Sequence, residues 1–392
     1  MRPKETMNLE HAAEMQTEFT DQLMAQTRVF RAPGRVNLIG EHTDYNDGFV
    51  MPAAIDFATN VTIAPRADRR LSVFSENFGE AIEFDLDDPE PRAASHWSDY
   101  VRGVAVVLER SGHRLRGANL RIRGEVPIGS GLSSSAAIEV ATAHALLANS
   151  ELSLGPAELA KLCQRAENEF VGMRCGIMDQ FIACCGQAGK ALMLDCRSLE
   201  YKLLPLPAEV RLVICNTMVK HELASSEYNV RRAECEAGVH HFAQSRPNVR
   251  ALRDVTAAEL ERSRVDLSEV IYRRCRHVIS ENARVLEAAE ALESSDLEAF
   301  GQLMNESHRS LRDDYEVSCK ELDLMVELAV PVEGVFGSRM TGGGFGGCTI
   351  SLVTAQNVEE FKRIVTRGYQ DKTGLTPEVY VCNAAQGAEE VI

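Results

Sequence analysis

The chain has 392 residues, of which 45% are hydrophobic and 26% are charged, and its 58 acidic and 42 basic side chains give a net charge of −16. These proportions are typical of a globular protein of two or three domains, and they exclude disorder, collagen-like repeats and a disulfide-stapled miniprotein. A chain this acidic repels nucleic-acid phosphates and anionic membrane surfaces, so we expect neither as a partner. An anionic small ligand would need a local positive site or a divalent cation.

The cysteines indicate free thiols. Eleven of them lie between Cys163 and Cys382, and no C-x-x-C pair occurs. An odd number without the close spacing of zinc ligands is typical of a reducing compartment rather than of disulfides or a structural zinc site. The charged N-terminus does not resemble a signal peptide, and no apolar run reaches the roughly 18 residues of a membrane span. We therefore expect a cytoplasmic protein.

The first half of the chain is predicted to be rich in strands. Residues 1–25 have the pattern of a polar, amphipathic helix. Alternating apolar residues between turn-forming residues predict short strands at 50–51, 59–64, 71–74, 81–84 and 120–123. Apolar residues at helical spacing predict helices over 97–110, 133–148 and 156–170.

The second half is predicted to be mostly helical. Strands are expected at 191–195 and 211–216, followed by helices over 227–242, 267–292, 297–311 and 318–329. The end of the chain predicts a strand at 348–353, a helix over 358–370 and a strand at 378–381. This order predicts an α+β protein of two domains, residues 26–200 and 201–392.

The first polar cluster is a glycine-serine segment, Pro127–Ala137 (PIGSGLSSSAA). Gly129 and Gly131 let the backbone approach a ligand closely, and residues 133–135 stand at the start of a predicted apolar helix. A helix start has unpaired N–H groups and a partial positive charge, which favour phosphate. The Walker pattern G-x-x-x-x-G-K-[ST] is absent. The segment therefore predicts a phosphate site, and a glycine turn with a serine N-cap is the alternative.

The second cluster is Met340–Cys348, in which five of six consecutive residues from Gly342 to Gly347 are glycine. Such a run cannot form the interior of a stable helix or strand, so the fold must use its conformational freedom. It predicts either a backbone nest that shapes a nucleotide pocket or a flexible hinge.

The third cluster, Arg31–Tyr45, brings Arg35, Glu41, His42 and Asp44 within ten residues, beside a short apolar strand. Each carboxylate can accept hydrogen bonds from two adjacent hydroxyls of a sugar, so this composition suits a ligand with many hydroxyls. A solvated turn after a strand is the alternative.

A further carboxylate, Asp179, lies in the apolar stretch Cys175–Phe181 (CGIMDQF). A carboxylate among apolar residues is either a buried helix cap or a functional group, and the bare sequence leaves both interpretations open.

Together these clusters resemble the GHMP kinases. The first resembles the family's phosphate loop, the second its C-terminal glycine-rich motif, and Pro33–Tyr45 (PGRVNLIGEHTDY) the signature of its galactokinases. The resemblance runs from about Phe30 to Gly387. Further segments similar to galactokinases are Cys175–Phe181 (CGIMDQF), Asp195–Leu199 (DCRSL), Ser226–Tyr228 (SEY) and Arg312–Tyr315 (RDDY).

The resemblance implies a GHMP-kinase fold with a mixed-sheet N-terminal domain, a ferredoxin-like C-terminal domain and an active site in the cleft between them. It implies transfer of the γ-phosphate of ATP to the C1 hydroxyl of α-D-galactose, with Mg²⁺, as the first committed step of galactose metabolism. We also expect a monomer.

The resemblance also assigns roles to residues. Asp179 would be the catalytic carboxylate, and Arg35 would stabilise the transferred phosphoryl group. The predicted sugar-binding residues are Glu41, His42, Thr43, Asp44, Gly176, Asp179 and Tyr228. The predicted ATP-binding residues are Ser75, Trp97, Gly129, Ser130, Gly131, Leu132, Ser133, Ser134 and Ser135. Ser135 and Glu167 would hold magnesium, with Ser134 as the competing ligand, and Trp97 could instead be a core aromatic residue.

Three questions stay open in the sequence. Asp179 could remove the proton of the attacking hydroxyl, or the site could act mainly by positioning reactants and neutralising charge. An N-acetylgalactosamine kinase would have similar motifs, because sequence does not display the volume of a pocket. A catalytically silent galactose sensor would also bind both ligands, although Ser135 and Asp179 are intact here.

Overall fold

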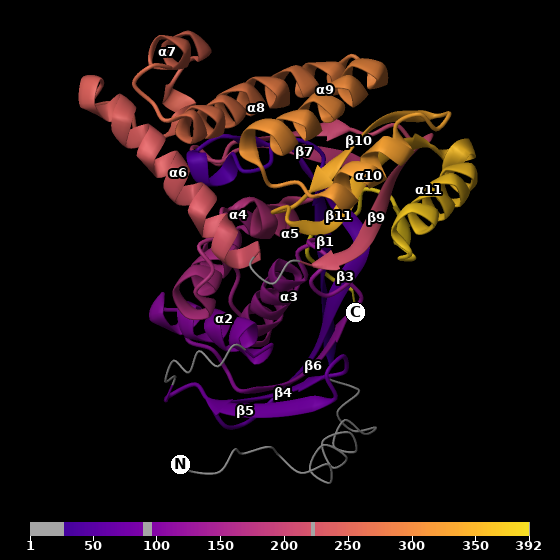
Figure 1. The fold of residues 1–392 in the computed structure, drawn as a ribbon. Helices are drawn as coiled ribbons and strands as arrows, with labels where there is room; N and C mark the ends of the chain where they lie inside the picture. The colour runs from indigo at the N-terminus through magenta and orange to yellow at the C-terminus, as the bar shows by residue number, and fades with distance from the viewer. Residues whose placement is uncertain (1–26, 89–95, 221–223, 392) are drawn as a thin grey trace.

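The computed structural model describes residues 27–88, 96–220 and 224–391 (Figure 1). The amphipathic helix predicted over residues 1–25 lies outside the described residues. Within them the chain forms three sheets and two groups of helices, which confirms the predicted α+β class.

The largest sheet has six strands in the order β13-β1-β3-β6-β4-β5. Strand β4 is parallel to β6, and the other neighbours are antiparallel, so the sheet is mixed as predicted. The strands are β1 (Arg28–Asn37), β3 (Pro52–Pro65), β4 (Arg70–Ser75), β5 (Glu80–Asp85), β6 (Ala118–Gly124) and β13 (Glu389–Glu390).

An irregularity in β1 prepares the site. The register of β1 against β3 shifts between Pro33 and Arg35, and the Arg35 backbone N–H donates instead to the carbonyl of Leu132, at 3.0 Å. Proline has no N–H to give to a sheet, and a bulge re-aims the side chains beside it. The bulge therefore connects the start of the sugar-type signature, which is Pro33–Tyr45, to the glycine-serine segment.

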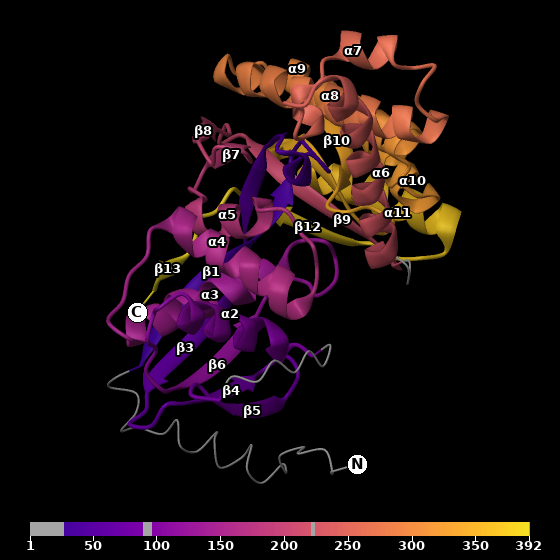
Figure 2. The same ribbon diagram turned by 90° about the vertical axis from the view of Figure 1, so that its left-hand side faces the viewer.

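Helices pack against this sheet and share its core (Figure 2). They are α2 (Ser98–Arg110), α3 (Ser134–Asn149), α4 (Pro156–Ala166) and α5 (Met178–Cys185), and α4 continues into a π-helical turn, η3 (Glu167–Val171). Helix α3 is apolar nearly all round, as its sequence predicts, and lies between the sheet and the other helices.

The second half of the chain builds a four-stranded antiparallel sheet in the order β10-β11-β9-β12. Alternate residues of β9 face opposite sides: Leu212 and Ile214 pack toward α8 and α9, whereas Val213 and Cys215 pack toward α10 and α11. The strands are β9 (Val210–Lys220), β10 (Val335–Thr341), β11 (Gly346–Thr354) and β12 (Glu378–Cys382).

The helices of this half lie on both sides of the sheet or extend beyond it (Figure 1). They are α6 (Ala224–Ser245), α7 (Ala257–Arg262), α8 (Glu269–Glu293), α9 (Leu297–Ser310), α10 (Lys320–Ala329) and α11 (Val358–Thr373). A π-helical turn, η5 (Leu311–Tyr315), extends α9, and 3-10 turns form η2 (Asp44–Asn46), η4 (Leu252–Asp254) and η6 (Ala355–Asn357).

The two halves are joined by more than one crossing of the chain. A small sheet pairs the strand that follows the Pro33–Tyr45 signature with two strands that precede β9. Its strands are β2 (Phe49–Val50), β7 (Lys190–Asp195) and β8 (Tyr201–Pro205). After β12 the chain returns to the first sheet, where Ala384 bridges to Ile55 and β13 pairs with β1. The boundary near residue 200 stays a prediction.

The predicted elements within the described residues are confirmed, with one change and several omissions. The helix predicted over 156–170 is α-helical only to Ala166 and then widens into η3. The sequence analysis did not predict α5, α7, β8, β10 or β13. In the part of the chain that the structure describes, no helix combines the length and apolar character of a membrane span. All eleven cysteines are free, as predicted.

We predict that Gly301→Ala destabilises the protein. A Cβ at Gly301 in α9 would lie 2.0 Å from the carbonyl oxygen of Phe336 at the start of β10. Because backbone cannot yield as a side chain does, the helix and strand must move apart, at a cost of roughly 1–3 kcal/mol. The melting temperature should fall by several degrees in differential scanning fluorimetry.

The matched control is Gly155→Ala. Gly155 has an ordinary φ of −64°, and its Cβ would meet no atom within 4 Å. Gly155 is the N-cap of α4, a position where alanine is less favourable than glycine, so this variant should lose a little stability but less than Gly301→Ala. Equal melting of the two variants would contradict the prediction.

Candidate active site

The centre of the site is an ion pair between Arg35 and Asp179. Arg35 Nε donates to Asp179 Oδ1 at 2.9 Å, and Nη2 donates to Oδ2 at 2.7 Å. This two-point geometry fixes the plane of the carboxylate as well as its position. Burial alone would lower the pKa of Arg35, but the negative charges of Asp179, Glu41 and Asp44 raise it above its ordinary value. The guanidinium is therefore a permanent cation in an acidic cleft.

The glycine-serine segment closes on this pair. Ser133 Oγ donates to Asp179 Oδ2, and Arg35 Nη1 donates to the carbonyl of Gly131 at 2.5 Å. Ser133 has φ 60° and ψ 47°, a left-handed conformation that is strained for a serine. Such strain persists only where neighbouring contacts hold it, and it concentrates at functional sites. The loop that precedes α3 is thereby held against the carboxylate of Asp179 in α5.

A cavity of about 430 Å³ opens beside the pair. Its lining includes Arg35, Asp179 and residues of the phosphate-type loop, which is the part of the glycine-serine segment from Gly129 to Ser135. Of the predicted ATP and metal residues, it collects Ser75, Trp97, Gly129, Gly131, Ser133, Ser134, Ser135 and Glu167. Ser130 and Leu132 are buried and are absent from this lining, and the Ser130 hydroxyl donates to the carbonyl of Pro127 at 2.7 Å.

Trp97 forms one aromatic wall of the cavity. Its ring stacks on Phe78, with centroids 5.9 Å apart and planes 7° apart, and its Nε1 donates to Glu80 at 2.9 Å. The ring also packs against the core of the first sheet. Trp97 is therefore both a cavity wall and a partner of the core, so the two interpretations left open by the sequence are compatible.

The glycine-rich cluster meets the sugar-type signature at Glu41. Glu41 Oε1 accepts a hydrogen bond from the Gly342 backbone N–H at 2.7 Å, and the guanidinium of Arg339 lies 3.4 Å from the same oxygen. Gly342 has φ 84°, which favours glycine. One function of this cluster is therefore to turn the backbone so that an N–H points at a buried carboxylate.

Asp44 lies against Gly176. A Cβ at Gly176 would be 1.8 Å from Asp44 Oδ2, so only glycine fits beside this carboxylate. Burial, followed by the charges of Asp179 and Glu41, raises the pKa of Asp44 to about 7. A carboxyl held in this state can exchange hydrogen bonds with a ligand that brings its own donors.

His42 and Tyr228 complete the predicted sugar-binding group. Their rings lie 5.5 Å apart between centroids. His42 is buried with φ 63°, and desolvation, followed by the charge of His277, lowers its pKa to about 3. The imidazole is therefore neutral. Thr43 is fully buried, and its hydroxyl donates to the carbonyls of Gly40 and Phe49, which commits it to the local turn.

Glu167 belongs to a buried network behind the phosphate-type loop. The amide nitrogen of Gln180 donates to Glu167 Oε2 at 2.6 Å and to Glu139 Oε2 at 3.0 Å. Burial, then the charge of Asp179, raises the pKa of Glu167 to about 7, and the nearby Ser135 hydroxyl acts in the opposite direction. The described residues contain no cluster of three or more histidine, cysteine or acidic side chains arranged as a metal site.

Several residues of the site escaped the sequence analysis. Arg339, Gln180 and Tyr315 each contact or support a predicted ligand-binding residue, and Phe78 stacks on Trp97. The only signal for the first three was their position in or beside a motif. Nothing in a single sequence distinguishes Phe78 from a core or surface aromatic residue.

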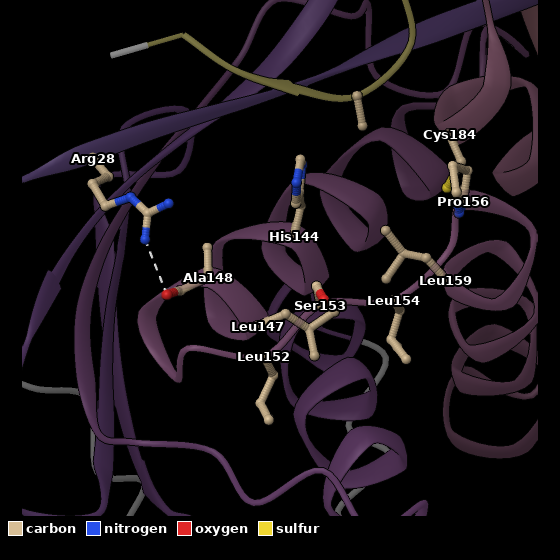
Figure 3. A pocket seen from close by; sticks show the side chains of 11 residues that line it. Arg28, His144, Leu147, Ala148, Leu152, Ser153, Leu154, Pro156, Leu159 and Cys184 are labelled. Carbon is tan, nitrogen blue, oxygen red and sulfur yellow. Dashed lines mark hydrogen bonds between the residues drawn. The ribbon is translucent and has the colours of Figure 1, made fainter.

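A second cavity, of about 350 Å³, lies at the other end of α3 (Figure 3). Leucines dominate its lining, and none of its lining residues is acidic. Its one arginine, Arg28, donates to the carbonyl of Ala148 at 3.0 Å and pairs with Glu390. With no carboxylate and its cation already paired, this cavity lacks the groups for phosphoryl transfer.

Sequence models of three protein families match the chain. The model of the GHMP kinases N terminal domain matches residues 99–187, and that of the GHMP kinases C terminal domain matches residues 288–371. The galactokinase galactose-binding signature matches residues 17–65, which include β1 and the Glu41–Asp44 turn. The matches therefore cover both the predicted phosphate loop with Asp179 and the predicted sugar-binding turn with Arg35.

Whole-chain comparisons agree with these matches. A galactokinase of Roseiflexus sp. (strain RS-1) is 50% identical over 364 residues, 93% of each chain. One of Actinobacillus succinogenes is 46% identical over 365 residues, 92% of this chain and 94% of that one. The crystal structure of Lactococcus lactis galactokinase complexed with galactose is 38% identical, with a TM-score of 0.92 over 98% of this chain and 100% of that one.

A more distant likeness concerns the fold alone. The mevalonate kinase of Methanococcus jannaschii is 19% identical, with a TM-score of 0.64 over 91% of this chain and 98% of that one. The fold therefore extends to proteins with little sequence in common with this one.

We predict that Asp44→Asn stabilises the ligand-free protein at alkaline pH while weakening its activity. Because the pKa of Asp44 is raised from 3.8 to about 7, the folded state holds this proton more tightly than the unfolded state. Ionisation therefore costs the folded state stability as pH rises through this interval. Asparagine carries no such charge, so the melting temperature of the variant relative to wild type should increase from pH 5 to pH 8.

The same substitution removes a charged acceptor, so kcat/KM for the sugar should fall about 10- to 100-fold. A melting difference that does not change with pH would show that Asp44 ionises at its ordinary pH. Unchanged sugar kinetics would show that Asp44 lies outside the sugar site.

Proposed function

Because this chain belongs to the galactokinases of the GHMP kinase family, we propose that it transfers the γ-phosphate of ATP to the C1 hydroxyl of α-D-galactose. The product is galactose 1-phosphate. The residues that carry this reaction are inferred here from the geometry of the site and from the motifs.

The observation that carries the proposal is the position of the Arg35–Asp179 pair. It lies on the wall of the cavity that the Ser133–Ser135 loop also lines, and it is close enough to Glu41 and Asp44 for their charges to raise the pKa of Arg35. A triphosphate on the loop and a sugar hydroxyl on the acidic side would therefore meet at this pair. Phosphoryl transfer needs such positioning and charge neutralisation above all.

Asp179 would align the attacking hydroxyl, and Arg35 would stabilise the transferred group. Both carboxylate oxygens of Asp179 accept hydrogen bonds from Arg35, and Oδ2 accepts a further one from Ser133. A carboxylate whose two oxygens already accept three hydrogen bonds is fixed in orientation and has few acceptor sites left for a further proton. This favours the positioning account, in which the hydroxyl proton leaves late along a loose transition state.

We infer that Ser135 and Glu167 hold a magnesium ion, with Ser134 as the competing ligand. The buried carboxyl of Glu167 has a raised pKa, and the Ser135 hydroxyl lies close enough to oppose that rise. Both residues line the same cavity as Ser134. Oxygen donors beside a phosphate site are those that magnesium prefers. When bound, the ion would neutralise charge on the phosphates of ATP.

The remaining inferences concern the surroundings of the protein. A cytoplasmic location is supported by the eleven free thiols, which persist where disulfides are reduced. A monomeric state remains a prediction.

The experiment is a panel of hexoses with magnesium and ATP in a coupled ADP-release assay, followed by NMR identification of the phosphorylated carbon. Galactose phosphorylated at C1 is the expected result, and glucose should be poor because its C4 hydroxyl points elsewhere. A preference for N-acetylgalactosamine would show that this sugar, and not galactose, is the substrate. Saturable galactose binding without ADP release would show that the protein is a galactose sensor and not a kinase.

We predict that Asp179→Asn abolishes turnover while ATP binding is largely retained. The amide keeps the shape of the side chain but loses the charge that Arg35 pairs with. The rate should fall by at least the roughly 10²–10⁴-fold typical of a lost acid–base or orienting group. Single-turnover kinetics and calorimetric binding of ATP measure the two effects, and turnover within tenfold of wild type would remove Asp179 from the reaction.

A further inference from the structure

The Arg312–Tyr315 segment (RDDY) has no part in the proposed chemistry, yet its last two residues are buried behind the sugar-type signature. It belongs to the π-helical turn η5, in which Asp314 and Tyr315 are buried whereas Arg312 and Asp313 are exposed. A π-helical turn is rare and is found frequently at functional sites. It inserts an extra residue into α9, which changes the direction of the side chains that follow.

One hydrogen-bond chain runs from Tyr315 to His42. The Tyr315 hydroxyl shares a hydrogen bond of 2.7 Å with the Tyr45 hydroxyl, which shares one of 2.8 Å with His42 Nδ1. At its far end the Tyr315 hydroxyl lies 3.1 Å from Cys235 Sγ. No described residue meets hydrogen-bond geometry with the buried His42 Nε2, although the backbone of Gly343 is close enough to the ring to act on its pKa. Nε2 is therefore the ring nitrogen at which a ligand can bind.

A second chain runs from Asp314 to the backbone of Glu41. The Ser310 hydroxyl donates to Asp314 Oδ2 at 3.2 Å and shares a hydrogen bond of 2.9 Å with His277 Nδ1. His277 Nε2 lies 3.1 Å from the carbonyl oxygen of Glu41. The η5 turn thus reaches two consecutive residues of the signature through two separate chains.

The Tyr315 ring lies between the two imidazoles. Its centroid is 4.7 Å from that of His42 and 4.6 Å from that of His277. His42 has a left-handed φ of 63°, a strained conformation that persists only when its surroundings hold it. Ring packing on one side and the hydroxyl chain on Nδ1 supply that support. The chain also couples the tautomer of His42 to the direction in which the two hydroxyls donate, because each hydroxyl has one proton to give.

We propose that Tyr315 is a positioning residue for sugar recognition: through Tyr45 it holds the orientation of His42, whose Nε2 meets one hydroxyl of the sugar. This rests on the proposed function, because it takes His42 as a contact of the sugar. Tyr315 touches neither substrate in this arrangement. Its removal should therefore affect recognition of a single hydroxyl rather than the phosphoryl transfer.

The test compares Tyr315→Phe with Tyr369→Phe. Tyr369 is also fully buried, and its hydroxyl donates to the carbonyl of Thr217 at 2.9 Å within α11 and β9, so both variants lose one buried hydroxyl with a partner. Tyr315→Phe should raise KM and the calorimetric Kd for galactose about three- to tenfold, with kcat and KM for ATP within twofold of wild type. Tyr369→Phe should leave all four constants unchanged.

A series of monodeoxygalactoses then separates positioning from general loosening. The ratio of Kd between Tyr315→Phe and wild type should fall to about one for the single analogue that lacks the hydroxyl contacted by His42, and stay elevated for the others. An equal ratio across the series, or an equal effect in Tyr369→Phe, would overturn the proposal. If Tyr315→Phe does not fold, Tyr45→Phe interrupts the same chain one link nearer to His42 and is judged by the same criterion.

The failure of the proposed function is distinguishable from the failure of this inference. A wild-type chain that phosphorylates no sugar would refute the function, whereas the positioning role is read from the difference between variants in equilibrium binding of galactose. Absence of galactose binding by the wild-type chain would overturn both.

Discussion

The buried pair of Arg35 and Asp179 is the interaction on which the site depends. It joins a strand of the first sheet to the start of α5, and the loop before α3 closes on both partners through Gly131 and Ser133. Loss of the partly exposed Asp179 carboxylate would leave the buried Arg35 guanidinium with only the charges of Glu41 and Asp44 to offset it. The pair thus holds three segments distant in sequence at one point and supplies a cation in a cleft that otherwise gathers carboxylates.

The second constraint is the excess of negative charge in the cleft, which contributes to the raised pKa values of Asp44 and Glu167. Asp44 and Glu167 each have a pKa near 7, with burial as the main cause and neighbouring carboxylates as the next. Such groups are poorly satisfied in the free protein. Ligands that bring hydroxyl donors to Asp44 or positive charge to Glu167 would relieve this cost, so the ligand-free site is less stable than its packing alone would permit.

Two of the residues with a strained, left-handed backbone lie at the site. Ser133 and His42 are both left-handed without being glycine. Ser133 is held by its hydrogen bond to Asp179, 46 residues away, and His42 by one with the nearby Tyr45. Gly176 allows a close approach of Asp44 that a side chain would prevent, and Gly342, with a φ of 84°, turns its N–H toward Glu41. The fold therefore pre-organises the cleft before any ligand arrives, with the η5 turn supporting the acidic side from behind.

The sequence by itself determined the α+β class, most helices and strands, and the identity of the main polar clusters. It could do so because periodicity and glycine-serine composition are local properties, and because the signature around Pro33–Tyr45 is long. It also identified Arg35, Asp179 and the serine loop as candidates. It did not reveal α5, the bulge that turns Arg35 toward Leu132, or the left-handed conformation of His42.

Only the tertiary structure decided which of these clusters meet and what holds them. Whether Asp179 was a buried cap or part of the cleft depended on Arg35, which lies 144 residues away. Arg339, Gln180 and Tyr315 gain their importance only from long-range contacts, and residue type carries no record of such contacts. The raised pKa of Asp44 likewise follows from burial beside Gly176 and from the carboxylates of Asp179, far along the chain, and Glu41. Desolvation is a property of the folded environment and not of the residue.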